Sequence, residues 1–173
     1  LLSSGDLDGT YRLVEESGRL TLLAGEESGV LYGVFHILRI IATEQSLKRL
    51  DVRRAPSQPL RMMNHWDNMD GSIERGYSGQ SFFFVNNRIV IDERTTDYAR
   101  LVASVGLNAV VINNVNVKQE ASYLITEKHF KDVAALAEVF AGYGIKLYLC
   151  LNFASPIEIG SMDSADPLDK EVI

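Results

Sequence analysis

The stretch that decides the fold is TDYARLVASVGLNAVVINNV, residues 96–115. Its first half places apolar side chains at the spacing of one helical face, at Tyr98, Leu101, Val102 and Val105. Gly106 follows at the position where a helix commonly ends. Residues 109–115 begin as a continuous apolar run, which is typical of a strand covered on both faces. A helix that leads directly into a buried strand indicates an α/β fold.

The same alternation continues on both sides of this stretch. Residues 60–66 predict a preceding strand, residues 127–143 a second helix that stops at Gly144, and residues 145–153 a third strand. Strands separated by helices in this way form right-handed βαβ units with a parallel sheet. Two crossovers do not distinguish an open doubly wound sheet from a closed (β/α)8 barrel, which needs about 250 residues.

The first 55 residues predict a separate, smaller α/β unit. Residues 11–15 and 20–23 alternate on either side of a turn, which predicts a hairpin, and a helix follows with Ser28 as its N-cap. We expect this helix to bury one apolar stripe, made of Val30, Leu31, Val34, Phe35, Leu38 and Ile41. Residues 46–59 are rich in charge and contain two prolines, so they predict a linker, and we place the domain boundary between residues 55 and 56.

Composition limits the partners and cofactors. Seventeen Lys and Arg against 23 Asp and Glu give a net charge of −6, so no broad basic surface is expected for nucleic acid or an anionic membrane. The apolar runs are shorter than the roughly 18 residues of a membrane span. The three histidines show no metal-ligand spacing, and no glycine-rich phosphate loop is present. The sequence therefore predicts no metal and no cofactor.

Polar and aromatic side chains gather where the predicted strands end. The densest group is Asn64-His65-Trp66-Asp67-Asn68-Met69-Asp70, and Asn113-Asn114-Val115-Asn116 follows the next strand. Enzymes with parallel sheets place their sites at these carboxyl ends. An indole ring beside amides and a carboxylate suits a sugar, which offers a CH face and hydroxyls. In the alternative interpretation, Trp66 fills a gap in the core and the amides cap turns.

Four segments resemble glycoside hydrolase family 67, the xylan α-glucuronidases. They are LRMMNHWDNMDGSIERGY at 60–77, NNVNV at 113–117, NFASP at 152–156 and ADPLD at 165–169. In addition, SGVLYGVF at 28–35 is similar to the end of that family's N-terminal α/β domain. The resemblance implies that residues 1–55 are the C-terminal part of this accessory domain. It also implies that residues 56–173 are the first three βα units of a (β/α)8 TIM barrel.

The resemblance implies a reaction and a binding pocket. The reaction is hydrolysis, with inversion, of the α-1,2 link between glucuronic acid, or its 4-O-methyl ether, and xylooligosaccharides. Trp66 would border the pocket for the uronic acid, and Val115 would line it near the C4 substituent. The other residues that we expect to bind substrate are Asn113, Asn114, His65 and Asp67.

The resemblance assigns no catalytic residue to this chain. Inversion requires an acid and a base on opposite sides of the scissile bond, with room for a water molecule between them. In the family these carboxylates come from the fourth strand and later strands, which would follow residue 173. We therefore expect a fragment that carries part of the pocket and is inactive alone.

The expected partners are glucuronoxylan-derived oligosaccharides, and the parent protein is compatible with a homodimer. Uncovered strand edges and apolar faces predict that the fragment self-associates. Two alternatives remain open. A non-catalytic carbohydrate-binding α/β module would use Trp66 and the asparagines in the same way, whereas another small hydrolase would need an acid and a nucleophile that the sequence does not offer. The sequence leaves a bacterial cytoplasmic and a periplasmic or extracellular location equally open.

Overall fold

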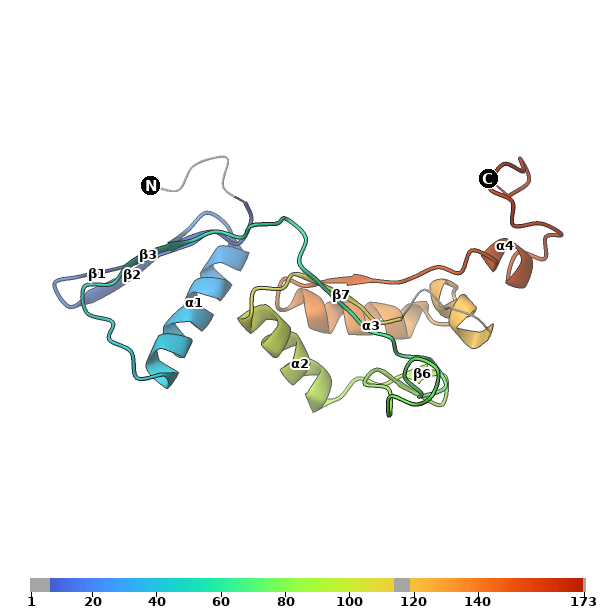
Figure 1. Cartoon of the computed structure of the whole chain (residues 1–173), viewed down its shortest axis with the longest axis horizontal. Helices are drawn as coiled ribbons and strands as arrows, with labels where there is room; N and C mark the ends of the chain where they lie inside the picture. The colour runs from blue at the N-terminus through green and yellow to red at the C-terminus, as the bar shows by residue number, and fades with distance from the viewer. Residues whose placement is uncertain (1–6, 114–118, 173) are drawn as a thin grey trace.

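The structure, a computed structural model, describes residues 7–113 and 119–172 and contains two main sheets (Figure 1). The first sheet is antiparallel, in the order β2-β1-β3, and is made of β1 (Tyr11–Glu16), β2 (Arg19–Ala24) and β3 (Asp51–Arg54). Helix α1 (Glu27–Ala42) packs on it around a small core of Tyr11, Leu13 and Tyr32. The predicted hairpin and the helix that follows it are confirmed.

Residues 46–59 are not a linker throughout, because Asp51–Arg54 forms the strand β3. Val52 pairs with Leu13 of β1, and Arg12 donates two hydrogen bonds to the Asp51 carboxylate at 2.9 and 2.8 Å. The sequence did not predict this strand, because a run of charged residues is typical both of an edge strand and of a linker.

Helix α1 presents a different face to the sheet from the one predicted. It begins after Glu26, two residues before the expected N-cap Ser28. Gly29 and Gly33 approach the sheet so closely that an added Cβ would collide with the Thr10 carbonyl group and the Leu22 side chain. This contact turns part of the predicted stripe outward, and the exposed residues are Val30, Val34, Leu38 and Ile41. The burial predicted for these four residues is therefore wrong.

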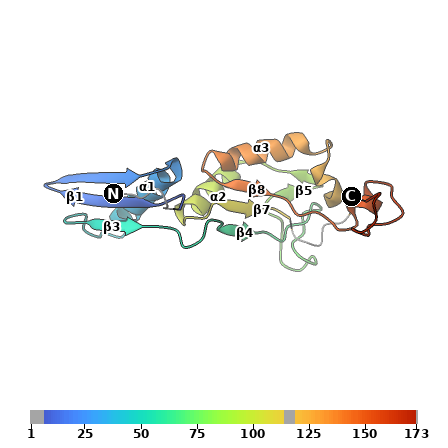
Figure 2. The ribbon, with the colours of Figure 1, turned by 90° about the horizontal axis from the view of Figure 1, so that it is seen from above.

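The second sheet is parallel, in the order β4-β7-β8, and Figure 2 shows its strands side by side. Its strands are β4 (Met62–Asn64), β7 (Ala109–Val111) and β8 (Lys146–Tyr148). Helices α2 (Glu93–Ser104) and α3 (Phe130–Ala141) contact each other and lie on the same side of the sheet. The predicted α/β class and the parallel βαβ units are confirmed, although β4, β7, β8 and α3 are shorter than predicted.

Helix α2 begins three residues earlier than predicted because of its cap. The Asp92 side chain accepts a hydrogen bond from the Thr95 backbone N–H at 3.2 Å, and the Thr95 hydroxyl accepts one from the Asp92 N–H at 3.2 Å. This reciprocal capping box satisfies backbone donors that a helix start leaves unpaired.

The long segment between β4 and α2 folds over the main core. It contains the hairpin of β5 (Phe84–Val85) and β6 (Arg88–Ile89), and it buries Phe83 and Phe84 completely. The largest fully buried side chains of this core also include Val102, Val110, Ile112, Leu124, Leu136 and Phe140. The strand ends are therefore held by a loop that has its own apolar anchors.

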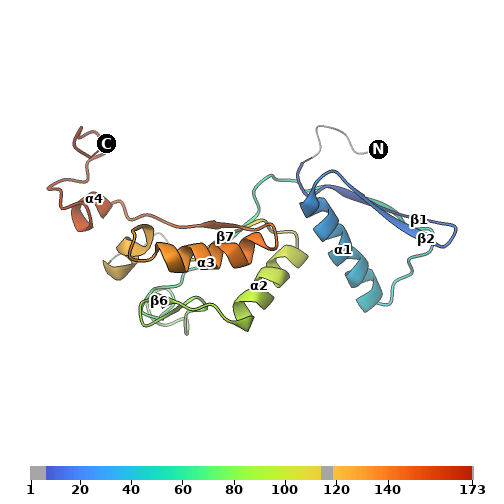
Figure 3. The same cartoon turned by 180° about the vertical axis from the view of Figure 1, so that it is seen from behind.

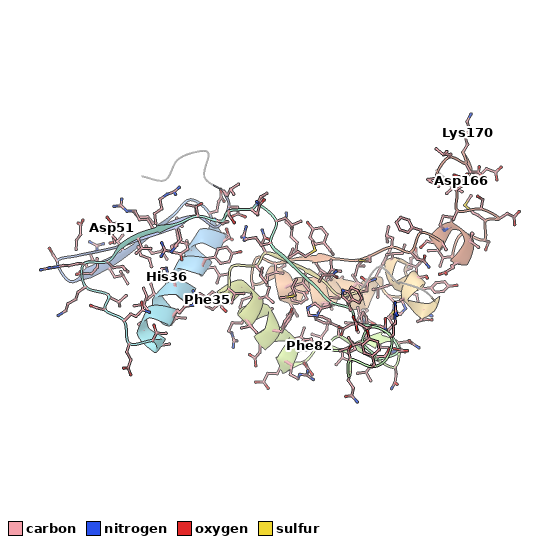
Figure 4. The ribbon with its side chains drawn as sticks, viewed as in Figure 1. Phe35, His36, Asp51, Phe82, Asp166 and Lys170 are labelled. Carbon is pink, nitrogen blue, oxygen red and sulfur yellow. The ribbon has the colours of Figure 1, made fainter. Side chains whose placement is uncertain are left out.

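The connections after β7 and β8 end in short helical turns, a 3-10 helix (Gln119–Ile125) and α4 (Ser155–Glu158). Asp166 begins a turn, and its carboxylate accepts the Leu168 N–H at 2.9 Å. Figure 4 shows Asp166 and Lys170 in the extended segment beyond α4. Among the described residues, no helix has both the length and the apolar character to cross a membrane.

Helices α1 and α2 bring the two sheets together, as the view from behind in Figure 3 shows. Leu31 and Phe35 of α1 pack against the core of the second sheet, and Figure 4 shows Phe35 directed toward α2. The strands of residues 11–54 and 62–148 belong to different sheets. A domain boundary between residues 55 and 56 stays a prediction.

Candidate functional site

His65 follows β4 and lies on the face of the parallel sheet that the helices cover. Its backbone N–H donates to the Val111 carbonyl at 2.9 Å and so extends the ladder by one bond. Its Nε2 lies 2.5 Å from the Tyr98 hydroxyl of α2, and its ring meets Phe83 edge to face with 4.9 Å between the centroids. His65 is thus built into the contact between the strand end, the long loop and α2.

Asp67 organises the long loop from a buried position. One carboxylate oxygen accepts hydrogen bonds from the Ser81 hydroxyl, from the Phe82 N–H at 2.6 Å and from the Phe83 N–H at 3.3 Å. The other oxygen lies 3.9 Å from Nδ1 of His65. Because a buried carboxylate needs such partners, these bonds fix where the loop leaves β4.

Burial sets the protonation of the His65 and Tyr98 pair. Burial lowers the pKa of His65, and the negative charge of Asp67 opposes that shift only in part. Burial also raises the pKa of Tyr98 to about 12, with Asp67 adding to the rise. At neutral pH the histidine is therefore neutral and the tyrosine protonated, so the Tyr98 hydroxyl can donate to Nε2 of His65.

Trp66 occupies the opposite face of the strand end. Since neighbouring strand residues point to opposite faces, the contact of His65 with α2 turns Asn64 and Trp66 to the helix-free face. Trp66 is 44% exposed there, and Tyr148, the register partner of Val111 on the neighbouring strand, is 38% exposed. The interpretation in which Trp66 fills a core gap does not agree with this exposure.

Asn113 ties the end of β7 to the end of β8. Its side-chain carbonyl accepts the Cys150 N–H at 2.8 Å, and its amide donates to the Cys150 carbonyl at 3.1 Å. The residue is buried, so its amide group continues the ladder where the backbone pairing stops. The other two predicted binding residues on this loop, Asn114 and Val115, lie outside the described residues.

The carboxylates near the strand ends all have local structural partners. Asp70 accepts hydrogen bonds from the Ser72 hydroxyl and N–H, at 2.7 and 2.8 Å, and these bonds lower its pKa. Hydrogen bonds from Tyr77 and Ser78 lower the pKa of Glu74, and Asp92 caps α2. Within residues 7–113 and 119–172, no three acidic, histidine or cysteine side chains converge to hold a metal ion.

The structure brings His65, Asp67 and Asn113 to one end of the sheet, as the sequence predicts for carboxyl-terminal strand ends. Sequence reasoning missed two members of this cluster, Tyr98 and Ser81. Tyr98 counted only as an apolar stripe residue, and Ser81 lies 14 residues from the carboxylate that it contacts. No spacing rule joins such positions, although an isolated tyrosine on a core-facing stripe signals that its hydroxyl needs a polar partner.

Comparison with known proteins identifies the family. Residues 40–173 match the Glycosyl hydrolase family 67 middle domain. This chain belongs to glycoside hydrolase family 67. It is 43% identical over 169 residues to "Probable alpha-glucuronidase A" of Aspergillus terreus and 41% identical over 173 residues to "Alpha-glucuronidase A" of Emericella nidulans. The alignments cover 97% and 96% of this chain and 20% of each relative, so the chain spans about a fifth of their length.

A solved structure shares the arrangement of elements. It is "GH138 enzyme targeting pectin rhamnogalacturonan II", with a TM-score of 0.52 and 13% identity to this family 67 chain. The superposition covers 86% of this chain and 19% of that one. At this identity the likeness shows the fold alone.

Proposed function

We propose that this family 67 chain forms the first three βα units of a (β/α)8 barrel in an inverting α-glucuronidase, preceded by the end of an N-terminal α/β domain. The consecutive strand order β4-β7-β8, with α2 and α3 on one side, is the arrangement of successive barrel units. In this proposal the helix-free face is the barrel interior, and the strand ends near Trp66 form one wall of the pocket.

The proposed reaction is hydrolysis of the α-1,2 link between (4-O-methyl)glucuronic acid and xylooligosaccharides during xylan degradation. The observation that carries this proposal is family membership, together with relatives named alpha-glucuronidase at about 40% identity. Glucuronoxylan-derived oligosaccharides are the proposed ligands, and a homodimeric parent protein stays part of the proposal.

Among the predicted binding residues, we propose two roles. Trp66 contacts the sugar, because its indole is exposed on the helix-free face. Asn114 and Val115 lie outside the described residues and stay proposed binding residues because of the family resemblance alone. His65, Asp67 and Asn113 hold the strand ends in place through the bonds to Tyr98, to the long loop and to Cys150. Their side chains act on the pocket by fixing the backbone that carries Trp66.

The chain alone is proposed to be inactive. An inverting enzyme needs two carboxyl groups roughly 6.5–9.5 Å apart on opposite sides of the bond. Asp67 is buried under the loop, whereas Asp70, Glu74 and Asp92 serve turns and a helix cap. From the family resemblance, we propose that the catalytic acid and base lie in parts of the protein outside this chain.

An assay on aldouronic acids tests this proposal. The purified chain should release no uronic acid, whereas the full-length protein that contains it should do so with inversion, which NMR detects from the anomer formed first. Trp66→Ala in the full-length protein should raise KM, while Phe130→Ala, which removes another exposed aromatic side chain at the start of α3, should not. Turnover by the chain alone, or equal effects of the two substitutions, would contradict the proposal.

A non-catalytic carbohydrate-binding module is the second candidate. The exposure of both Trp66 and Tyr148 on the helix-free face, which we also call the open face, favours a binding module, since such modules stack sugars on aromatic rings. Calorimetry on the isolated chain separates the two functions. Equal, saturable affinity for plain and glucuronic-acid-substituted xylooligosaccharides would favour a module, whereas preference for the uronic acid end agrees with a glucuronidase pocket.

A further inference from the structure

A cavity lies away from the strand ends, where the two sheets meet. It has a volume of about 470 Å³, within the range of roughly 300–1,000 Å³ typical of small-molecule sites. Helix α1, the end of β3 and the turn after α2 surround it. We call it the interunit cleft, and its polar lining consists mainly of Tyr11, Tyr32, His36, Arg39, Arg54 and Arg61.

The interunit cleft concentrates positive charge in an acidic chain. Three arginines line it and none of its lining residues is Asp or Glu, although the whole chain carries a net charge of −6. Other arginines are paired, since Arg12 binds Asp51 and Arg100 binds Asp97. Within residues 7–113 and 119–172, none of the three cleft arginines forms an ion pair with a carboxylate.

Two of these guanidinium groups are held in place by neutral backbone oxygens. Arg39 donates to the Ser104 carbonyl at 2.6 Å, which joins α1 to the end of α2. Arg61 donates to the carbonyls of Gly106 and Gln58, each at 2.6 Å. A carbonyl fixes the position of a guanidinium without neutralising its charge, so both cations are ordered before any anion arrives.

Arg54 supplies the third charge from the exposed end of β3. Its guanidinium makes one hydrogen bond among the described residues, to the Arg53 carbonyl at 3.3 Å. A guanidinium has five N–H donors in a planar fork that matches the oxygens of a carboxylate or phosphate. Arg54 therefore has donors available for an anion held between it and the fixed Arg39 and Arg61.

The histidine of the cleft responds to this positive field. His36 accepts or donates one hydrogen bond with the Tyr11 hydroxyl at 2.9 Å, and Figure 4 shows it on α1. Burial is the main cause that lowers the pKa of His36, and the charges of Arg54 and Arg39 lower it further. The same two arginines counteract the rise that burial causes in the pKa of Tyr11.

We propose that the interunit cleft binds a monosaccharide-sized anion through one carboxylate or phosphate group, with Arg54 and Arg39 as its main hydrogen-bond donors. The site is separate from the strand ends around Trp66 and does not depend on the proposed glucuronidase activity. Because residues from α1, β3 and the turn after α2 all contribute, a bound anion would also bridge the two sheets.

Calorimetry and NMR titration of the chain test this proposal at constant ionic strength. The probes are inorganic phosphate, glucose 6-phosphate and glucuronate, with glucose as the uncharged control. We expect saturable binding of at least one anion, no binding of glucose, and backbone shift changes centred on His36 and Arg54. Tighter binding of glucose 6-phosphate assigns a phosphate site, and tighter binding of glucuronate assigns a carboxylate site.

Matched variants separate a site from general charge. Arg54→Gln removes one cleft cation and should weaken anion binding by about tenfold, the value of one charge-assisted hydrogen bond. Arg19→Gln removes the same charge from β2 of the same sheet, outside the cleft, and should change affinity less than about twofold, as expected for a distant, screened charge. The proposal is overturned if none of the anions saturates the unmodified chain, or if both variants lose affinity equally. Circular dichroism confirms that each variant is folded, and the NMR map of the unmodified chain decides the question independently of them.

Discussion

The two faces of the parallel sheet β4-β7-β8 are made by the same short strands and differ in what covers them. On one face, Val110 and Ile112 are fully buried beneath α2, α3 and the long loop. On the other face, Asn64 and Tyr148 of the two outer strands are exposed, and Val111 between them is buried. The total accessible surface of 11338 Å² exceeds the about 8,400 Å² of a compact monomer of 19.2 kDa. The contrast between the two faces indicates that the sheet needs cover on both sides, as parallel sheets normally do.

The largest effect should come from the covered face. Phe140 of α3 is fully buried and packs near Phe83, with 6.2 Å between ring centroids. Phe140→Ala should lower the free energy of unfolding by about 3–5 kcal/mol, because it removes buried apolar surface and leaves a cavity. Urea denaturation followed by circular dichroism measures this loss. Tyr148→Ala on the open face is the matched control, and a loss as large as that of Phe140→Ala would refute the contrast between the faces.

The next effect concerns the loop that closes over the covered face. Asp67→Asn keeps the size of the side chain but removes the charge that holds the Ser81 hydroxyl and two backbone N–H groups. We expect a loss of about 1.5–3 kcal/mol in the free energy of unfolding, the range for hydrogen bonds to a charged group. Hydrogen exchange should quicken at residues 81–84. Asp70→Asn, in the same loop but largely exposed, serves as the control and should leave exchange at Phe83 unchanged.

The contrast between the faces was only partly readable from the sequence. The apolar run at 109–112 predicts a strand covered on both sides, and Gly106 and Gly144 predict where the helices end. The helical pattern of α1 predicted a buried stripe that includes Val34 and Leu38, yet both are exposed, because Gly33 lets another face approach the sheet. Periodicity identifies which side of a helix is apolar. Which side packs against the sheet, and how closely, also depends on the shape of the sheet surface.

The site shows the same division between local and distant information. The position of Trp66 at a strand end follows from the pattern of residues 60–66, and its exposure agrees with the sugar interpretation. The clamp of Asn113 on Cys150 and the bond of His65 to Tyr98 join residues 37 and 33 positions apart. Such pairs form only once the strands and helices have packed together. Short-range spacing in the sequence gives no information about that packing.

A smaller effect, which depends on pH, tests the contact between His65 at the end of β4 and Tyr98 of α2 on the covered face. The pKa of Tyr98 is about 12 in the folded chain, above its ordinary value of 10.0. Between these two values the unfolded chain loses the proton while the folded chain keeps it, so stability falls as the pH rises from 10 to 12. Tyr98→Phe should make this fall shallower, as chemical denaturation at each pH would reveal. Tyr11, whose pKa is raised by burial, and Tyr77, whose pKa is raised by its hydrogen bond to Glu74, should retain the rest of the slope.

The smallest effect on stability, with a clear effect on association, should come from the open face. We propose that this face drives self-association of the chain, because apolar and aromatic groups at the edge of an uncovered sheet favour contact between copies. Tyr148→Lys should change the free energy of unfolding by no more than about 0.5 kcal/mol, as exposed substitutions usually do. It should nevertheless shift sedimentation velocity profiles toward the monomer, since a charge on this face disfavours its burial. Phe130→Lys places the same charge at the exposed start of α3, on the helix-covered side of the sheet, and should leave association unchanged. Equal shifts in both variants would mean that overall charge, and not the helix-free face, controls assembly.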